Sequence, residues 1–484
     1  MQNKDKKLIA FLKGSAILTT ANMVLKAINF FLLPLYTKYL TPEALGVSDT
    51  ITNVSAVIFP LLVMGLDSAF SAFYFEDRSA ERQKKVFNTI WFTLLLASAV
   101  PFLLIIGANF WSLMLFGKEG YAGLIAISLV GISMNLWYLP FALLVRMENR
   151  MAIFAVINIT ASLSMIGLNI FFVAGLKMGA AALILSSAIV QGLQLILYLI
   201  LSHAKVNIQF YDNQLIKKMI KFALPLIPIA IVGWLLNLSD RYILLWYHGE
   251  VEVGIYGIAA RFSSALAVFS NAVYMAYTTF AFDKQEDSNA QHQYSRILNA
   301  FFLILGFVCF TVSVFSKEII ILMTSKAYWD AYLMLPCILF GQLAYGVNTI
   351  VGYGISFAHK TEYTLLATTC GAGLNIVLNF IFIPDYGMVA AAATTFTSYV
   401  LMVILSYIFS QRVYPCKYRI ARILLSGVIL FAISQITINA MIGLKIAIWV
   451  AAGIILLFVF KDVIRDIRKL IKLCIGWIKT RKAN

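Results

Sequence analysis

Three cationic side chains lie inside long apolar stretches of the chain: Lys26, Arg241 and Arg261. A charge that faced lipid at the centre of a bilayer would cost about 3 kcal/mol or more, so each must face protein or a water-filled cavity. Arginine can hold a phosphate through two parallel hydrogen bonds. A group of such cations is therefore typical of a site for an anionic ligand.

Lys26 belongs to a polar stripe on the first apolar segment, residues 13–39. The polar residues of this stripe recur at steps of three and four, which places them on one face of a helix. The stripe consists of Ser15, Thr19, Asn22, Lys26 and Asn29. Lys26 alone could pair with a buried carboxylate for structural reasons, but a whole polar face favours the lining of a cavity.

Arg241 and Arg261 differ in how well a structural role would explain them. Arg241 follows Asp240 near the end of its apolar segment, so an interfacial ion pair is as good an interpretation as ligand binding. No acidic residue lies within one helical turn of Arg261, which favours a functional role there. We therefore expect Arg261 to face a cavity.

Three asparagines complete the predicted substrate-binding set: Asn22, Asn29 and Asn53. Their side-chain amides could form hydrogen bonds with a polar ligand. Buried asparagine is as often a polar contact between two membrane helices, and this alternative stays open.

Two carboxylates, Asp49 and Asp67, lie in the second apolar segment. Asp49 is close to one end of the segment and could cap the membrane interface. Asp67 lies deeper and has Ser68 beside it, so it either pairs with Lys26 or binds a coupling ion, H⁺ or Na⁺. No spacing in the sequence favours one of these roles.

The elements that must position these residues are membrane-spanning helices. The 484-residue chain is 61% hydrophobic and 12% charged, which leaves too little polar surface for a soluble protein of this size. Its apolar runs are about 20 residues long, as membrane-spanning helices require. We therefore predict an all-α polytopic membrane protein with fourteen transmembrane helices. The segments are 13–39, 44–74, 85–107, 122–146, 151–175, 179–202, 219–247, 254–281, 294–316, 329–358, 362–384, 388–410, 420–442 and 444–461.

The basic residues are distributed unevenly between alternate loops. The terminal regions and the loops after even-numbered segments hold 29 of the 38 Lys and Arg, and the opposite loops hold six. The positive-inside rule then places both termini in the cytoplasm. The same distribution explains the net charge of +16 without nucleic acid as a partner.

The chain contains an internal repeat. Gly46-Val47-Ser48 matches Gly254-Ile255-Tyr256 at a shift of 208 residues, and 168–182 matches 378–392 at a shift of 210. Two copies of six helices should be related by a pseudo-two-fold axis along the membrane normal, with a site between them. By the first shift, Asn53 corresponds to Arg261.

These patterns give the predicted domain boundaries. The parts are an N-terminal lobe at 1–202, a cytoplasmic link at 203–218, a C-terminal lobe at 219–411, two further helices at 412–461 and an amphipathic cytoplasmic tail at 462–484. Thr41-Pro42-Glu43 predicts the start of the second helix, with Thr41 as N-cap and Pro42 as first helical residue.

Motifs for enzyme chemistry are lacking in the sequence. It contains no phosphate-binding GxxxxGK[ST] loop and no HExxH, and its five cysteines and four histidines are scattered. We therefore expect no cofactor, no metal site and no enzymatic activity.

Three short stretches resemble a known family. Lys13-Gly14-Ser15-Ala16, Leu40-Thr41-Pro42-Glu43-Ala44-Leu45-Gly46 and Glu252-Val253-Gly254-Ile255-Tyr256 are similar to those of bacterial polysaccharide flippases, the Wzx-type branch of the multidrug/oligosaccharidyl-lipid/polysaccharide (MOP) exporter superfamily. This resemblance implies a multi-pass protein of the bacterial cytoplasmic membrane. Such a protein would move undecaprenyl-diphosphate-linked oligosaccharide from the inner to the outer leaflet by alternating access, for cell-surface polysaccharide biosynthesis.

The resemblance also implies site residues. In the related peptidoglycan-precursor flippases, cations on the first, second and eighth helices line a cavity between two lobes. Lys26 and Arg261 lie on the first and eighth helices here, while the second offers Asn53. The last two helices resemble those that form a groove for the lipid tail.

Two rival functions stay open. A cation-coupled multidrug exporter of the same fold would depend on Asp67, although the intramembrane cations would repel cationic drugs. A polysaccharide polymerase or glycosyltransferase would need a large outer loop, whereas the longest outer loops, 108–121 and 317–328, have about a dozen residues.

Overall fold

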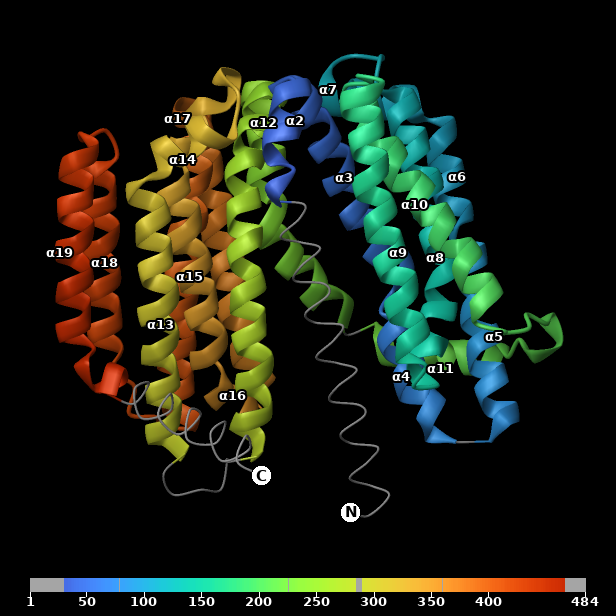
Figure 1. Cartoon of the computed structure of the whole chain (residues 1–484). Coiled ribbons are helices and arrows are strands. Elements are labelled where there is room, and N and C mark those ends of the chain that lie inside the picture. The colour runs from blue at the N-terminus through green and yellow to red at the C-terminus, as the bar shows by residue number, and fades with distance from the viewer. Residues whose placement is uncertain (1–29, 78, 225, 284–289, 359, 466–484) are drawn as a thin grey trace, which may run out of the picture. The chain divides into compact units, whose positions relative to one another are not determined.

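The computed structural model describes residues 30–77, 79–224, 226–283, 290–358 and 360–465, which are helical with no strand in these ranges (Figure 1). Eleven helical stretches among the described residues are long and apolar enough to cross a membrane. The prediction of an all-α polytopic fold is therefore confirmed.

Two of the longest helices each contain a break. α12 (Leu226–Asp283) is interrupted at Gly249, with φ of 78°, and α17 (Thr361–Val413) at Gly387, with φ of 54°. A positive φ is a conformation that glycine adopts without strain, so each long helix consists of two helices that meet at a glycine. Most of the expected segment 13–39 lies outside the described residues. The count of fourteen helices stays a prediction.

The chain forms two compact units. Unit 1 contains the chain up to Ile258 together with Asn379–Met388, and unit 2 contains Ala259–Leu378 and the chain from Val389. The lobe boundaries expected from the sequence stay a prediction.

Unit 1 is built around α8, which packs against α3, α5, α6, α7 and α10. Leu136, Phe141 and Val145 of α8 are completely buried there. Figure 1 shows α8, α9 and α10 running side by side. The helices of this unit are α2 (Leu33–Tyr39), α3 (Pro42–Val63), α4 (Leu66–Glu76), α5 (Ala80–Ala97), α6 (Ala99–Ile106), α7 (Ala108–Phe116), α8 (Ala122–Met147), α9 (Met151–Ile170), the π-turn η1 (Phe171–Gly175), α10 (Ala180–Leu201), the 3-10 turn η2 (Ile208–Phe210), α11 (Asn213–Ala223) and the first part of α12.

The start of α3 agrees with the prediction. Thr41 is the N-cap and accepts a hydrogen bond from the Ala44 N–H at 3.2 Å, and Pro42 is the first helical residue. The end differs, because Met64 and Gly65 both adopt the left-handed conformation and divide the expected helix 44–74 into α3 and α4.

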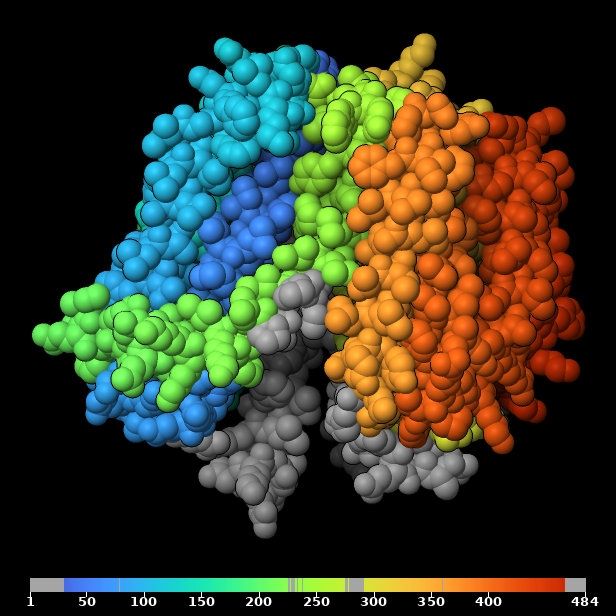
Figure 2. All heavy atoms as spheres, turned by 180° about the vertical axis from the view of Figure 1, so that it is seen from behind, coloured from blue at the N-terminus to red at the C-terminus, as the bar shows by residue number. Residues whose placement is uncertain are grey.

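α11 lies across the expected boundary at 218. Asp212 caps it by accepting hydrogen bonds from the N–H groups of Gln214 and Leu215. Its apolar face is buried against α4 and α5, and its lysines are exposed. Figure 2 shows the green segment that includes α11 lying against the blue segment of α4 and α5.

Unit 2 packs α13 against α15 and α18, as Figure 1 shows. Lys445 is completely buried and pairs with Glu318 at 2.8 Å. The helices are the remainder of α12, α13 (Ala290–Val314), α14 (Ser316–Met323), the 3-10 turn η3 (Lys326–Leu333), α15 (Leu335–Val351), α16 (Tyr353–Phe357), most of α17, α18 (Ile420–Thr437) and α19 (Ile442–Val459). The expected outer loops 108–121 and 317–328 are thus largely helical, because they contain α7, α14 and part of η3.

The second repeat match needs a correction in register. Gly179 precedes α10 with φ of 61° and ψ of −138°, and Gly387 precedes the second part of α17 with φ of 54° and ψ of −138°. The expected shift of 210 paired Gly179 with Val389, but the backbone pairs it with Gly387 at a shift of 208. The π-turn η1 lies in the first copy, a few residues before Gly179.

Candidate functional site

Arg241 and Asn53, two of the predicted substrate-binding residues, are in contact inside unit 1. Arg241 lies eight residues before Gly249 in α12, and Asn53 lies eleven residues after Pro42 in α3. At 1.5 Å per residue, both are about 12–16 Å along their helices from these ends. The Arg241 Nη1 donates a hydrogen bond of 3.3 Å to the Asn53 Oδ1.

The neighbouring Asp240 has other partners. It is 2% exposed, and its Oδ2 accepts a hydrogen bond of 2.5 Å from the Tyr256 hydroxyl. Its Oδ1 accepts the backbone N–H of Arg241. The Arg241 guanidinium contacts Asn53 and lies 5.9 Å from the centre of the Tyr256 ring. These contacts differ from the interfacial ion pair with Asp240 that the sequence allowed.

This cluster retains buried hydrogen-bond donors. The Arg241 Nε and the Asn53 Nδ2 are buried, and neither has a hydrogen-bond partner in the described part of the chain. Buried polar atoms are nearly always paired, and a donor left unpaired costs about 1–3 kcal/mol. The guanidinium charge, together with one unused donor on Arg241 and one on Asn53, can bind an oxygen-rich anion.

The two carboxylates occupy different surroundings. Asp49 is half-buried, seven residues after the start of α3. Asp67 is exposed in the first turn of α4, 25 residues after Pro42, which is about 37 Å when counted along the helices. The hydrocarbon core of a bilayer is about 30 Å thick, so this distance along the helices is longer than one membrane crossing.

Asp67 lines a largely apolar cavity of about 560 Å³ in unit 1. Ser68 is beside it, and the remaining wall comes from α3, from Leu139 of α8 and from the start of α12, including Ile227 and Trp234. The cavity could admit a small apolar or cationic molecule next to the carboxylate.

The other predicted substrate-binding residues lie in unit 2 or outside the described residues. Arg261 is half-buried in the part of α12 that belongs to unit 2, eleven residues after Glu250. Nearby on the same helix, the Ser263 hydroxyl donates a hydrogen bond of 3.2 Å to the Gln342 side chain. Lys26, Asn22 and Asn29 lie outside the described residues.

The repeat-related glycines Gly46 and Gly254 pack directly on each other's helices. A Cβ added to Gly46 would lie 1.8 Å from the Glu250 carbonyl oxygen, and a Cβ added to Gly254 would lie 2.0 Å from the Pro42 carbonyl oxygen. Pro42 and Glu250 are also separated by 208 residues, so the contact is reciprocal. We call this region, where the start of α3 meets the Gly249 break of α12, the Pro42 end.

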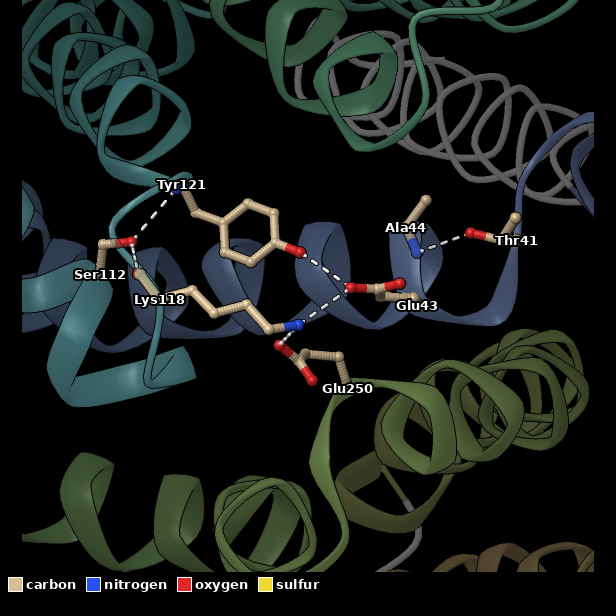
Figure 3. A network of polar contacts seen from close by, with 7 residues as sticks. All are labelled: Thr41, Glu43, Ala44, Ser112, Lys118, Tyr121 and Glu250. Atoms are coloured by element: carbon tan, nitrogen blue, oxygen red, sulfur yellow. Dashed lines mark hydrogen bonds and ion pairs between the residues drawn. The ribbon is translucent and has the colours of Figure 1, made fainter.

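A charged network crosses the Pro42 end (Figure 3). The Lys118 Nζ donates a hydrogen bond of 3.1 Å to the Glu43 Oε1 and forms an ion pair of 3.4 Å with Glu250. The Tyr121 hydroxyl also donates to the Glu43 Oε1, at 3.1 Å. The hydrogen bond to Glu43, together with the charge of Glu250, raises the pKa of Lys118 above its usual value. One lysine thus joins the starts of two helices.

Figure 3 also shows how the loop that carries Lys118 is held in place. The Ser112 hydroxyl of α7 donates a hydrogen bond to the Lys118 carbonyl and accepts one from the Tyr121 N–H at 3.2 Å. The sequence interpretation missed this network. The available signal was that Glu43 and Glu250 both lie at the start of the second helix of a repeat copy.

Comparisons with known proteins give matches to family models, to a relative and to solved structures. The model of a family described as "Polysaccharide biosynthesis protein" matches residues 11–280, which is more than half of the chain, and the MatE model matches residues 225–381. The probable low-salt glycan biosynthesis flippase Agl15 of Haloferax volcanii is 24% identical over 233 residues, which are 46% of this chain and 49% of Agl15. The chain thus matches about half the length of this relative.

Solved structures share the fold. A structure of the lipid II flippase MurJ in an inward closed conformation has a TM-score of 0.71 at 19% identity, covering 94% of this chain and all of that chain. An inward-facing multidrug resistance transporter of the MATE family has a TM-score of 0.58 at 14% identity, covering 83% of this chain and 96% of that chain. The chain therefore shares the fold of these two transporters.

Proposed function

Because the chain belongs to the polysaccharide biosynthesis protein family, we propose that it is a flippase that moves polyprenyl-diphosphate-linked oligosaccharide from the inner to the outer leaflet. The partial similarity to Agl15 and the fold shared with MurJ support this proposal. The matched proteins are transporters and not enzymes, which supports the absence of a catalytic role.

One observation carries the proposal. The Arg241 guanidinium and the Asn53 amide lie together inside membrane-spanning helices and keep buried donors without partners in the described part of the chain. A diphosphate supplies negative charge and acceptor oxygens, and an attached sugar supplies hydroxyls. The lipid tail needs no polar site, since it can stay in the bilayer. Arg261, Lys26, Asn22 and Asn29 stay proposed ligands.

Alternating access is part of the proposal. The reciprocal glycine contact and the Lys118 network close the Pro42 end tightly, and we propose that this end opens when the substrate leaves for the outer leaflet. We also propose a location in the bacterial cytoplasmic membrane with both termini in the cytoplasm. Undecaprenyl diphosphate as the carrier, and H⁺ or Na⁺ as the coupling ion, belong to the same proposal.

A second candidate function is cation-coupled multidrug export. The MatE match and the cavity lined by Asp67 favour it. In that case the transport of a cationic dye would depend on Asp67, and Arg241 would be dispensable.

The experiment compares leaflet exchange of a short-chain polyprenyl-diphosphate oligosaccharide with a labelled sugar in proteoliposomes. Arg241→Gln removes the charge, Asn53→Ala removes the amide, and Arg412→Gln at the exposed end of α17 serves as the matched control. Loss of a charge-assisted hydrogen bond of about 1.5–3 kcal/mol predicts exchange that is roughly 10–100 times slower in Arg241→Gln. Exchange that is equal in Arg241→Gln and Arg412→Gln would refute the site. Dye export abolished by Asp67→Asn, without lipid exchange, would favour the exporter.

A further inference from the structure

His248 and Glu252 connect two helix breaks in unit 1. His248 immediately precedes the Gly249 break of α12, and its Nε2 lies 2.8 Å from the Ile383 carbonyl oxygen of α17. Its Nδ1 lies 3.2 Å from the Glu252 Oε1, four residues further along the chain and beyond the Gly249 break. The Glu252 Oε2 accepts a hydrogen bond of 3.0 Å from the N–H of Met388, the residue that follows Gly387. The side chains of His248 and Glu252 thus join the Gly249 break of α12 to the Gly387 break of α17 at the Pro42 end.

The chemistry of these contacts requires an additional proton. A carbonyl oxygen can only accept, so the Nε2 of His248 must carry a hydrogen to bond Ile383. A neutral imidazole would then present a lone pair on Nδ1 to the Glu252 carboxylate, and two acceptors would face each other at 3.2 Å. The contact is attractive only if a proton lies between Nδ1 and Oε1, on an imidazolium or on a carboxylic acid.

The position of Glu252 is determined by more than this proton. Its carboxylate caps the second part of α17 through Met388, and it packs on Gly387, where a Cβ would collide with it. When the proton leaves, the acceptor repulsion is therefore relieved most easily by movement of His248 away from Glu252 and Ile383. The connection between the two breaks would then be lost.

We propose that His248 and Glu252 form a proton-binding site that fastens the two helix breaks to each other when it is occupied. Both side chains are partly exposed, 24% for His248 and 29% for Glu252. Histidine is the side chain that ordinarily changes charge between about pH 5 and 8, so an imidazole is suited to this role. The site differs from Asp67, the carboxylate for which the sequence left open either an ion pair or a coupling-ion role.

Other titratable groups near the site have separate surroundings. Glu250, two residues after His248 on α12, faces Lys118. Asp385 and Tyr386, in the connector of α17, are both exposed. The groups in contact with the imidazole nitrogens are the Glu252 carboxylate and the Ile383 carbonyl.

The test measures hydrogen exchange of the 383–388 backbone at pH 5.5 and 8.0, corrected for intrinsic exchange, in the full-length protein in detergent. We expect the wild type to exchange roughly ten times faster at pH 8.0. His248→Gln should show no such pH response, and His292→Gln, an exposed histidine of α13, should behave like the wild type. An equal pH response in the wild type and His248→Gln would overturn the proposal.

Glu252→Gln provides an independent test. Its amide oxygen can still accept from Met388, and its NH₂ group can donate to a neutral Nδ1, so no additional proton is needed. We expect this variant to keep slow exchange at pH 8.0, and fast exchange there would contradict the proton-sharing geometry.

A link between this site and transport rests on the proposed flippase function. Lipid exchange in proteoliposomes, with the pH of each compartment set separately, should respond to pH in the wild type and not in His248→Gln. A pH-dependent backbone without any lipid exchange would keep the proton site and reject the flippase. Lipid exchange without a pH-dependent backbone would reject the proton site and keep the flippase.

Discussion

The glycine contact at the Pro42 end gives the most direct test of the packing. In Gly46→Ala, the new Cβ would lie 1.8 Å from the Glu250 carbonyl oxygen, whereas ordinary contact begins at 3.4 Å. The two helix ends would have to separate by about 1.5 Å, because the clash is with backbone and not with a flexible side chain. Overpacking of this kind costs about 1–3 kcal/mol. Gly254→Ala should have a similar effect, since its Cβ would meet the Pro42 carbonyl oxygen at 2.0 Å.

The assay is thermal unfolding in one detergent, combined with lipid exchange. Gly167→Ala is the matched control, because Gly167 lies inside α9 with nothing within 4 Å of an added Cβ. Alanine favours a helix over glycine by about 0.5–1 kcal/mol, so the control should be neutral or slightly stabilised. A closed Pro42 end that is 1–3 kcal/mol less stable should open roughly 5–150 times more often.

The double variant sharpens this test. Once the first methyl group has separated the helix ends, the second has room, so Gly46→Ala with Gly254→Ala should cost clearly less than the sum of the single variants. If Gly46→Ala unfolds like Gly167→Ala, the two helix ends are not packed in the purified protein, and the argument for a closed Pro42 end fails.

Two further predictions concern buried and bridging charges. In thermal unfolding, Lys445→Met should destabilise the protein by about 2–3 kcal/mol, because Glu318 loses its partner. Adding Glu318→Gln should restore part of this stability. If it restores none, the packing of Lys445 matters more than its charge. Because the pKa of Lys118 is raised, its contribution to stability is present at neutral pH and is lost as pH rises above about 10.5. The wild type should therefore lose more stability than Lys118→Met between pH 9 and 11.5, and parallel pH profiles would refute the role of the lysine.

The helices could be predicted because their signals are local. An apolar run of about 20 residues identifies a span, and Thr41-Pro42 identifies the start of α3 through capping and a fixed φ. The break at Met64 was missed because its local signal in the sequence is weak. Methionine rarely adopts a left-handed conformation, so only the following Gly65 offered a signal, and a single glycine inside an apolar run is common.

The candidate site could be predicted only in part. Arg241 and Asn53 were identified because a polar group inside an apolar run needs a partner, wherever that partner lies. That they contact each other could not be predicted, since 188 residues separate them along the chain. Lys118 and His248 were overlooked, because charged and titratable residues at helix ends are ordinary, and only the folded chain reveals which acids they face.

The repeat explains why the Pro42 end combines symmetric packing with asymmetric chemistry. Gly46 and Gly254 occupy equivalent positions and approach each other through backbone alone, which requires no particular side chain on either copy. The residue equivalent to Pro42 is Glu250, so the two carboxylates that Lys118 binds, Glu43 and Glu250, lie at non-equivalent positions of the two copies. Symmetry can therefore provide the close fit, whereas the side chains that differ between the copies supply the charges and the titratable groups. We expect substitutions at the glycines to alter how tightly this end closes, and substitutions at the charged residues to alter how closure depends on pH.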